Sequence, residues 1–170
     1  MKRISFKDSG GLNLTQAVLS GRKTMTRRIA YRNDVYRIKY KVGDTVAIQQ
    51  AYRDIPAIVV SSSYACHKLS KSAGWRNKMF VKAELMPHHI RITDVRVEWL
   101  QDISDEDCMR EGIDEFTSGY NHCKLYNFAG DDTPYIIPRA AFAALIDKVS
   151  GCGTWQANPL VWVYSFELVD

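Results

Sequence analysis

Four basic residues and two threonines share eight positions in the segment GRKTMTRR, residues 21–28. A lysine amine whose pKa is lowered by burial or by neighbouring cations can act as a base, and a threonine hydroxyl beside such a base can attack a carbonyl. Arginine side chains can instead bind phosphate through paired hydrogen bonds, to which threonine hydroxyls add. A solvated basic turn is the third interpretation, and the pattern alone leaves all three open.

Glu111 is the second residue whose position suits chemistry. It lies at the end of a short predicted helix, which Ser104 caps and Gly112 ends. A carboxylate there could act as a general acid or base, or could orient a lysine. From spacing alone, an acidic residue on the helix surface is the favoured interpretation.

Histidine and glycine patterns narrow the range of chemistry. His88 and His89 are neighbours in a strand-like segment, so their side chains point to opposite faces and cannot bind one metal ion together without distortion. The chain also lacks the GxSxG, P-loop, HExxH and GxGxxG patterns, which removes the commonest hydrolase, nucleoside-triphosphatase and dinucleotide-binding interpretations. We predict no metal site and no cofactor.

Positive charge is concentrated at the start of the chain. Residues 1–40 hold ten lysines and arginines against two aspartates, a balance of +8, whereas the rest of the chain sums to −4. Such a basic segment indicates a polyanionic partner, with nucleic acid as the leading candidate. Pairing with the acidic segment at residues 102–115 is the alternative, and charge alone does not separate the two.

The length and composition are those of an ordinary globular protein. With 170 residues, 46% hydrophobic and 25% charged, the chain fits one domain, and it contains no apolar run long enough to span a bilayer. No apolar stretch follows the basic start, so we expect no secretory signal and no membrane partner. The four cysteines form no CxxC pair, which indicates reduced thiols in the cytoplasm, and the oligomeric state stays open.

The basic segment is expected to follow a short helix. Asn13 is an N-cap by type, with Gln16 three residues later, and apolar residues then recur at helical spacing. Gly21 suits the position just beyond the helix end, where cations also face the negative end of the helix dipole. The segment GRKTMTRR is therefore predicted to be a fixed turn.

A long strand is expected ahead of the helix that ends at Glu111. In HHIRITDVRVEWL, residues 88–100, the apolar side chains change phase between Ile92 and Val95. One extra residue near Thr93 and Asp94 would restore a single buried face, so we predict a β-bulge there.

Strands and one clear helix account for most of the remaining chain. Pro138 opens the helix, whose apolar face recurs at i, i+3 and i+4 positions until Gly151 ends it. Strands are expected at residues 2–6, 45–48, 79–85 and 159–169. Together these elements predict an α+β fold, in which about three helices flank a small, curved mixed sheet.

Two segments show no regular period and are expected to be mainly loops. Within residues 53–79, AIVVSSSYA (57–65) could be a strand, whereas CHKLSKSAGWRNK (66–78) is polar and basic and is predicted to be a loop. Residues 114–135 are aromatic, contain glycine and lack periodicity, which predicts a long loop. The first segment contains Trp75-Arg76-Asn77-Lys78. These four residues could form a surface binding loop, although a role for Trp75 in anchoring the loop is the favoured interpretation.

Four blocks of the sequence, taken in order, resemble the ASCH domain family, whose fold is similar to the PUA domain, a small β-barrel flanked by helices. The blocks cover most of the chain and read SGRKTMTRR, YKVGDTVAIQQAYR, IRITDVRVEWLQDISDEDCMREGI and FAALIDKVSGCGTWQANPLVWVYSFEL. The arrangement looks most like the versions carried by phages and prophages. Residues 1–170 are accordingly expected to form one PUA-like domain, with residues 53–79 and 114–135 as loop insertions.

The resemblance implies that RNA or a nucleotide binds in the cleft between the barrel and the helices, where the basic segment lies. RNA, a nucleotide or a modified nucleoside is therefore the implied partner. The residues expected to contact it are Gly21, Arg22, Lys23, Thr24, Arg27 and Arg28.

One branch of the family implies an alternative function, because it consists of amidohydrolases that deacetylate N4-acetylcytidine. Aligned motif to motif, its lysine, threonine and glutamate fall on Lys23, Thr26 and Glu111. Lys23 would deprotonate Thr26, Thr26 would attack the amide carbonyl, and Glu111 would help to protonate the leaving amine. Chains of that branch are much shorter, and this chain has an additional arginine, Arg27, beside Arg28.

Overall fold

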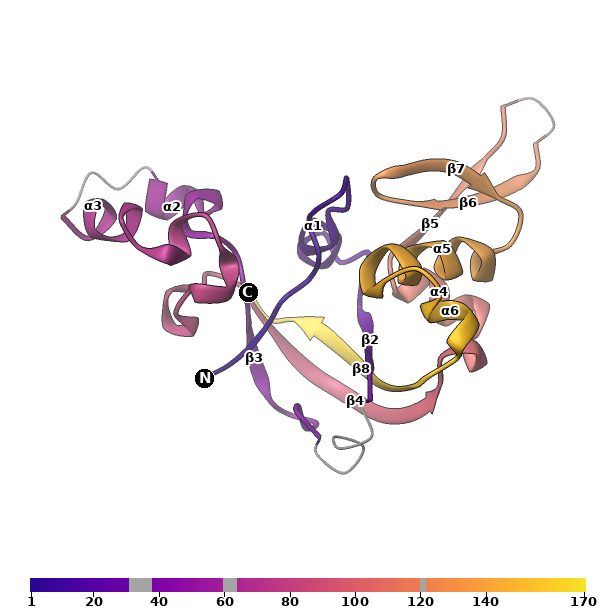
Figure 1. Ribbon diagram of the computed structural model, residues 1–170, viewed down its shortest axis with the longest axis horizontal. Helices are drawn as coiled ribbons and strands as arrows, with labels where there is room; N and C mark the ends of the chain where they lie inside the picture. The colour runs from indigo at the N-terminus through magenta and orange to yellow at the C-terminus, as the bar shows by residue number, and fades with distance from the viewer. Residues whose placement is uncertain (31–37, 60–63, 120–121) are drawn as a thin grey trace.

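The computed structural model describes residues 1–30, 38–59, 64–119 and 122–170 (Figure 1). A five-stranded sheet crosses its centre in the order β1-β3-β4-β8-β2. Its strands are β1 (Lys2–Ile4), β2 (Met25–Ile29), β3 (Thr45–Ile48), β4 (His89–Trp99) and β8 (Leu160–Leu168). The sheet is mixed, as predicted, because β1 pairs parallel with β3 and the other pairs are antiparallel. Within the described residues β1 and β2 are its edges, so the expected closed barrel is not observed.

Helices lie on either side of this sheet in the view of Figure 1. They are α1 (Leu14–Leu19), α2 (Pro56–Val59), α3 (Tyr64–Ser70), α4 (Asp105–Arg110), α5 (Pro138–Ser150) and α6 (Thr154–Ala157). The sequence predicted α1, α4 and α5, and their caps are confirmed: Asn13 accepts from the Gln16 amide and Ser104 accepts from the Asp107 amide. It did not predict α2, α3 and α6. No helix among the described residues is long and apolar enough to cross a membrane.

The β-bulge predicted in the long strand is confirmed. The register between β4 and β8 shifts between Ile92 and Asp94. The bulge does not restore one buried face, however, because Val97 and Trp99 beyond it are exposed. The expectation of a single buried face was therefore wrong for the end of the strand.

A second sheet replaces the loop predicted for residues 114–135. It consists of β5 (Ile113–Thr117), β6 (Lys124–Phe128) and β7 (Asp131–Tyr135), in that order. Most residues of these strands are exposed or half-buried, so no alternation of apolar and polar side chains marked them in the sequence.

Residues 53–59 and 64–85 fold into short helices and 3₁₀ turns, so the loop predicted there and the strand expected at 79–85 are both wrong. Beside α2 and α3 it forms 3₁₀ turns, which include Lys78–Phe80 and Ala83–Leu85. These turns cover a small apolar cluster, and Trp75 packs against it, which confirms the anchoring role of that side chain. The cluster consists of Ala47, Tyr52, Ile55, Val81, Ala83 and Met86.

The basic segment is only in part the predicted turn. Gly21 has a φ of +74°, in the left-handed region that ends a helix. From Met25 onwards, however, the chain is strand β2, which pairs along its whole length with β8. The last four residues of GRKTMTRR therefore belong to the edge of the central sheet.

Candidate functional site

Backbone hydrogen bonds fix the turn between α1 and β2 to three other elements. The Lys23 amide donates to the Ala17 carbonyl of α1, and the Thr24 amide donates to the Arg110 carbonyl at the end of α4, each over 2.9 Å. The Phe166 amide of β8 donates to the Thr24 carbonyl, also over 2.9 Å. These bonds bring the side chain of Lys23 next to the last turn of α4.

Lys23 and Glu111 form a buried ion pair at this junction. The Lys23 ammonium donates to Oε2 of Glu111 over 2.5 Å and to the backbone carbonyl of the same residue over 2.7 Å. The two side chains are only 3% and 5% exposed. Gly112 follows with a φ of +100°, which turns the chain sharply out of α4 and leaves Glu111 facing Lys23.

Burial lowers the pKa of the Lys23 amine below its ordinary value of 10.5. The positive charges of Arg28 and Arg27 act in the same direction, whereas Glu111 opposes them. An amine with a lowered pKa loses its proton at a lower pH than an exposed lysine does. It can then accept a proton from a nearby hydroxyl, which is the task of a general base.

Arg27 holds Glu111 from the other side, together with two further carboxylates. One terminal nitrogen of its guanidinium donates to Glu111 over 3.1 Å, and the other donates to Glu98 over 2.5 Å and to Asp107 over 3.1 Å. The side chain is fully buried, and its guanidinium lies 5.8 Å from the ring centre of Phe142. Burial alone would lower the pKa of the Arg27 guanidinium. The neighbouring carboxylates outweigh this effect and raise the pKa above its ordinary value. The donors of Arg27 are thus engaged inside the protein.

Thr26 lies one residue before Arg27 and on the opposite face of β2. Its side chain is buried and lines the same cavity as Lys23 and Glu111. Among the described residues no hydrogen bond joins its hydroxyl to Lys23, whose ammonium donates to Glu111 instead. Thr26 thus shares the cavity with Lys23 but is not hydrogen-bonded to it.

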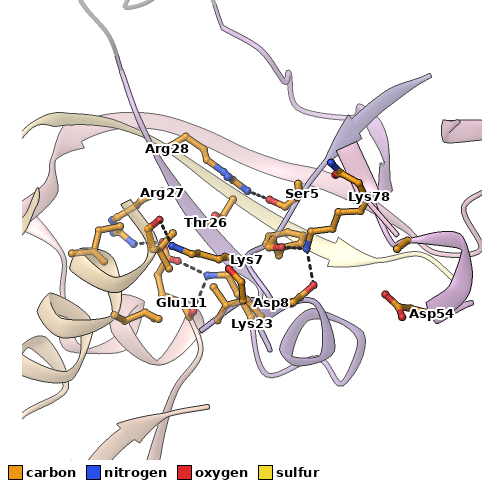
Figure 2. A pocket seen from close by; sticks show the side chains of 18 of the residues that line it. Ser5, Lys7, Asp8, Lys23, Thr26, Arg27, Arg28, Asp54, Lys78 and Glu111 are labelled. Atoms are coloured by element: carbon orange, nitrogen blue, oxygen red, sulfur yellow. Dashed lines mark hydrogen bonds and ion pairs between the residues drawn. The ribbon is translucent and has the colours of Figure 1, made fainter. Parts of the chain in front are cut away.

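Arg28 is the least neutralised cation of the basic segment. Its guanidinium donates to the Ser5 carbonyl over 2.6 Å and lies 5.7 Å from the ring centre of Phe6. No carboxylate of the described residues lies within ion-pair distance of it, and burial lowers its pKa. Figure 2 shows Arg28 reaching towards Ser5, away from the pair formed by Lys23 and Glu111.

Lys23, Thr26 and Glu111 face a common cavity of about 690 Å³ (Figure 2). This volume lies within the range of about 300–1,000 Å³ that is usual for small-molecule sites. Among the described residues of its lining, cations outnumber carboxylates by seven to three. The cations are Lys7, Lys23, Arg27, Arg28, Arg53, Arg76 and Lys78, and the carboxylates are Asp8, Asp54 and Glu111.

Three of the residues predicted to bind a ligand do not line this cavity. Gly21 and Arg22 are exposed, and Arg22 pairs with Asp114 over 2.7 Å. Thr24 accepts a long hydrogen bond of 3.5 Å from Arg110. The structure thus brings Lys23, Thr26, Arg27, Arg28 and Glu111 together and leaves the first part of the turn outside.

Sequence reasoning missed several other residues that line the cavity. Lys7 and Asp8 follow β1, and Arg53 belongs to the segment that was expected to be a loop. Arg76 and Lys78 lie in the tetrapeptide that could have formed a binding loop, which was the one signal in the sequence for any of these residues. Lys78 pairs with Asp8 over 2.6 Å and so connects this tetrapeptide to the segment that follows β1 (Figure 2). In the described ranges no three His, Cys, Asp or Glu side chains lie together as metal ligands.

Comparisons with known proteins found similarity among solved structures. No family model and no curated protein matches the chain. It is similar to a protein from Enterococcus faecalis V583 described by the family model DUF984, with 18% identity and a TM-score of 0.49, over 100% of this chain and 81% of that one. It is also similar to an ASCH domain from Lactobacillus crispatus JV V101, with 12% identity and a TM-score of 0.46, over 91% of this chain and 69% of that one. At such low identities and TM-scores, neither likeness assigns a function to this chain.

Proposed function

We propose that the protein binds a nucleotide, free or as part of single-stranded RNA, in the cavity beside the basic segment. The observation that carries this proposal is the seven-to-three excess of cations over carboxylates in a cavity of ligand size. Arg28 contributes together with Lys7 and Arg76, because none of these three cations pairs with a carboxylate of the described residues, and Arg28 is the one that lies on β2 beside Thr26. The resemblance of the sequence to the ASCH domain family implies the same class of ligand.

Titration calorimetry with the four nucleoside 5′-monophosphates tests this function. We expect at least one to bind, with an affinity that falls as salt is added, because ion pairs to phosphate are screened. Arg28→Gln should weaken binding about tenfold, since it removes a charged phosphate contact. Arg22→Gln is the matched control, because Arg22 lies in the same segment but outside the cavity, and it should bind as the unaltered protein does. Absence of binding by all four nucleotides, or binding that is indifferent to Arg28, would refute the proposal.

Hydrolysis of an amide on a modified nucleoside is the second function we propose, and the pair of Lys23 and Glu111 favours it. An unprotonated Lys23 would take the proton of the Thr26 hydroxyl, whose oxygen would then attack the amide carbonyl. As the carbon–nitrogen bond breaks, the departing amine would receive a proton through Glu111, and water would release the acyl group from Thr26. The step requires Lys23 and Thr26 to move into contact when the substrate binds.

Incubation with N4-acetylcytidine tests this reaction, with acetate and cytidine as the measured products. We expect turnover that is lost in Lys23→Ala and Thr26→Ala but kept in Thr24→Ala, which alters the same turn outside the cavity. Turnover that survives Lys23→Ala would reject the assigned roles. If nucleotides bind and no acylated nucleoside is cleaved, the binding function stands alone.

A further inference from the structure

A second cavity, of about 770 Å³, adjoins the first one. Both cavities are lined by Ser5, Arg27, Arg28 and Val149, which form their common wall. The side chain of Arg28 is therefore within reach of a ligand in either cavity. Neither the motifs of the sequence nor the proposed function uses this second space.

The pairing of β2 with β8 explains how one face of the sheet serves both cavities. In this antiparallel pair Thr26 lies opposite Tyr164, and Arg28 lies opposite Trp162. Directly opposed residues of neighbouring strands point to the same side, so these four side chains form one continuous row. Thr26 lines the first cavity, Tyr164 and Trp162 line the second, and Arg28 lines both.

The second cavity carries positive charge that its own walls do not neutralise. Arg27, Arg28 and Lys39 line it, and no Asp or Glu is found among the described residues of its lining. Lys39 is exposed and lies 5.2 Å from the ring centre of Tyr40, without a carboxylate partner among the described residues. The buried indole N–H of Trp162 also lacks an acceptor among the described residues. The wall thus supplies donors and lacks anions, which suits a ligand rich in acceptor oxygens.

The same wall is aromatic and apolar. Tyr40 and Tyr164 contribute rings that are almost fully buried, and the half-buried Trp162 contributes the ring that is accessible to a base. Ile4, Ile29, Ile38 and Met79 add apolar surface to the lining, and Met79 is exposed. Aromatic faces next to unpaired cations are the combination that binds a base together with the phosphate of a single-stranded nucleic acid.

We propose that the second cavity is a subsite for a second nucleotide, so that a dinucleotide step of a single strand occupies both cavities with its linking phosphate at Arg28. This inference rests on the proposed nucleotide binding in the first cavity. It replaces a mononucleotide by a short single strand as the preferred ligand. It also gives Arg28 the role of the contact between the two subsites.

Calorimetry with matched probes tests the second subsite: the four nucleoside 5′-monophosphates and the four 5′-phosphorylated dinucleotides with the same base twice. We expect the best dinucleotide to bind at least about tenfold more tightly than its mononucleotide, because one stacked base and one phosphate contact are added. Lys39→Glu should abolish this gain and leave mononucleotide binding unchanged. Lys41→Glu makes the same charge change two residues further on, outside both cavities, and should leave the gain intact.

The outcomes separate this inference from the function on which it rests. If a mononucleotide binds and no dinucleotide binds more tightly, the second subsite is refuted and the first site stands. A gain that survives Lys39→Glu, or that Lys41→Glu removes equally, also refutes the subsite. If none of the eight probes binds, the proposed function fails, and the second subsite fails with it.

Discussion

Lys23 and Glu111 lie 88 positions apart in the sequence and meet as an ion pair of 2.5 Å inside the protein. The two residues differ in their number of partners. Glu111 also accepts a hydrogen bond from Arg27, whereas Lys23 pairs with no other carboxylate of the described residues. Glu111 therefore holds two buried cations. This inequality sets the expected effects of substitution at the two positions.

Loss of Glu111 should destabilise the protein more than loss of Lys23. Glu111→Gln leaves Lys23 charged and unpaired in the interior, and we expect the free energy of unfolding to fall by about 3–5 kcal/mol. Lys23→Met should cost less, because Glu111 keeps its contact with Arg27. Urea denaturation of the two variants measures the difference. A cost for Lys23→Met that equals or exceeds that of Glu111→Gln would contradict the arrangement.

The lowered pKa of Lys23 should appear in the pH dependence of stability. Burial places the folded-state pKa below the ordinary value of 10.5, which applies to the unfolded chain. Between these two values the unfolded state binds more protons than the folded state, so the contribution of Lys23 to stability rises with pH in that window. Lys23→Met should lack this rise. The free energy of unfolding, measured for both proteins at several pH values up to 10.5, should therefore diverge as the pH increases, and a constant difference would argue against a lowered pKa.

Arg27 should be essential for stability, unlike the other arginines of its segment. Arg27→Gln leaves Glu98, Asp107 and Glu111 without their shared cation, and we expect a loss of about 3–5 kcal/mol in the free energy of unfolding. Arg22→Gln is the matched control, because the Arg22 pair with Asp114 is largely exposed, and it should change stability by no more than about 1 kcal/mol. Thermal unfolding of both variants provides the comparison, and similar losses would disprove the central position of Arg27.

The role of Arg27 illustrates which features local sequence could not predict. A run of basic residues is usually solvent-exposed, so GRKTMTRR was expected to be a turn throughout. Arg27 can be buried in a strand because carboxylates from β4, from α4 and from Glu111 directly after α4 surround it, 71 to 84 positions away. The sequence shows these acidic residues but not the pairing of β2, β4 and β8 that brings them together.

Features that depend on neighbouring residues were predictable. Caps at Asn13 and Ser104, and the bulge near Asp94, follow from side-chain types within a few positions. The second sheet, β5 to β7, could not be predicted from the sequence. Its faces are mostly exposed, and its strand β7 contains Pro134, which is unusual in a strand. Pro134 is tolerated since β7 is an edge strand, which cannot be known before the strand order is known.

Cys108 should be unreactive in the folded protein. Burial raises the pKa of its thiol from 9.0 to about 12, so very little thiolate is present at neutral or mildly alkaline pH. Iodoacetamide at about pH 8.5 should modify the exposed Cys152 at least about a hundredfold faster than Cys108. Mass spectrometry of tryptic peptides separates the two sites. Concentrated urea should remove the difference, and rapid labelling of Cys108 under native conditions would contradict its burial.

Gly130 should tolerate no side chain, because its backbone lies against the backbone of Gly11. A Cβ at Gly130 would lie 1.9 Å from the Gly11 carbonyl oxygen, and φ is +83°. Gly43 is a matched control, since its φ of +87° is similar but nothing lies within 4 Å of a Cβ there. We expect Gly43→Ala to lower the free energy of unfolding by about 1–3 kcal/mol, from backbone strain alone. Gly130→Ala should cost clearly more, because it also pushes β6 and β7 away from the turn that leads into α1 and the basic segment. Chemical denaturation of both variants measures these costs, and equal losses would show that the contact between Gly11 and Gly130 does not constrain the fold.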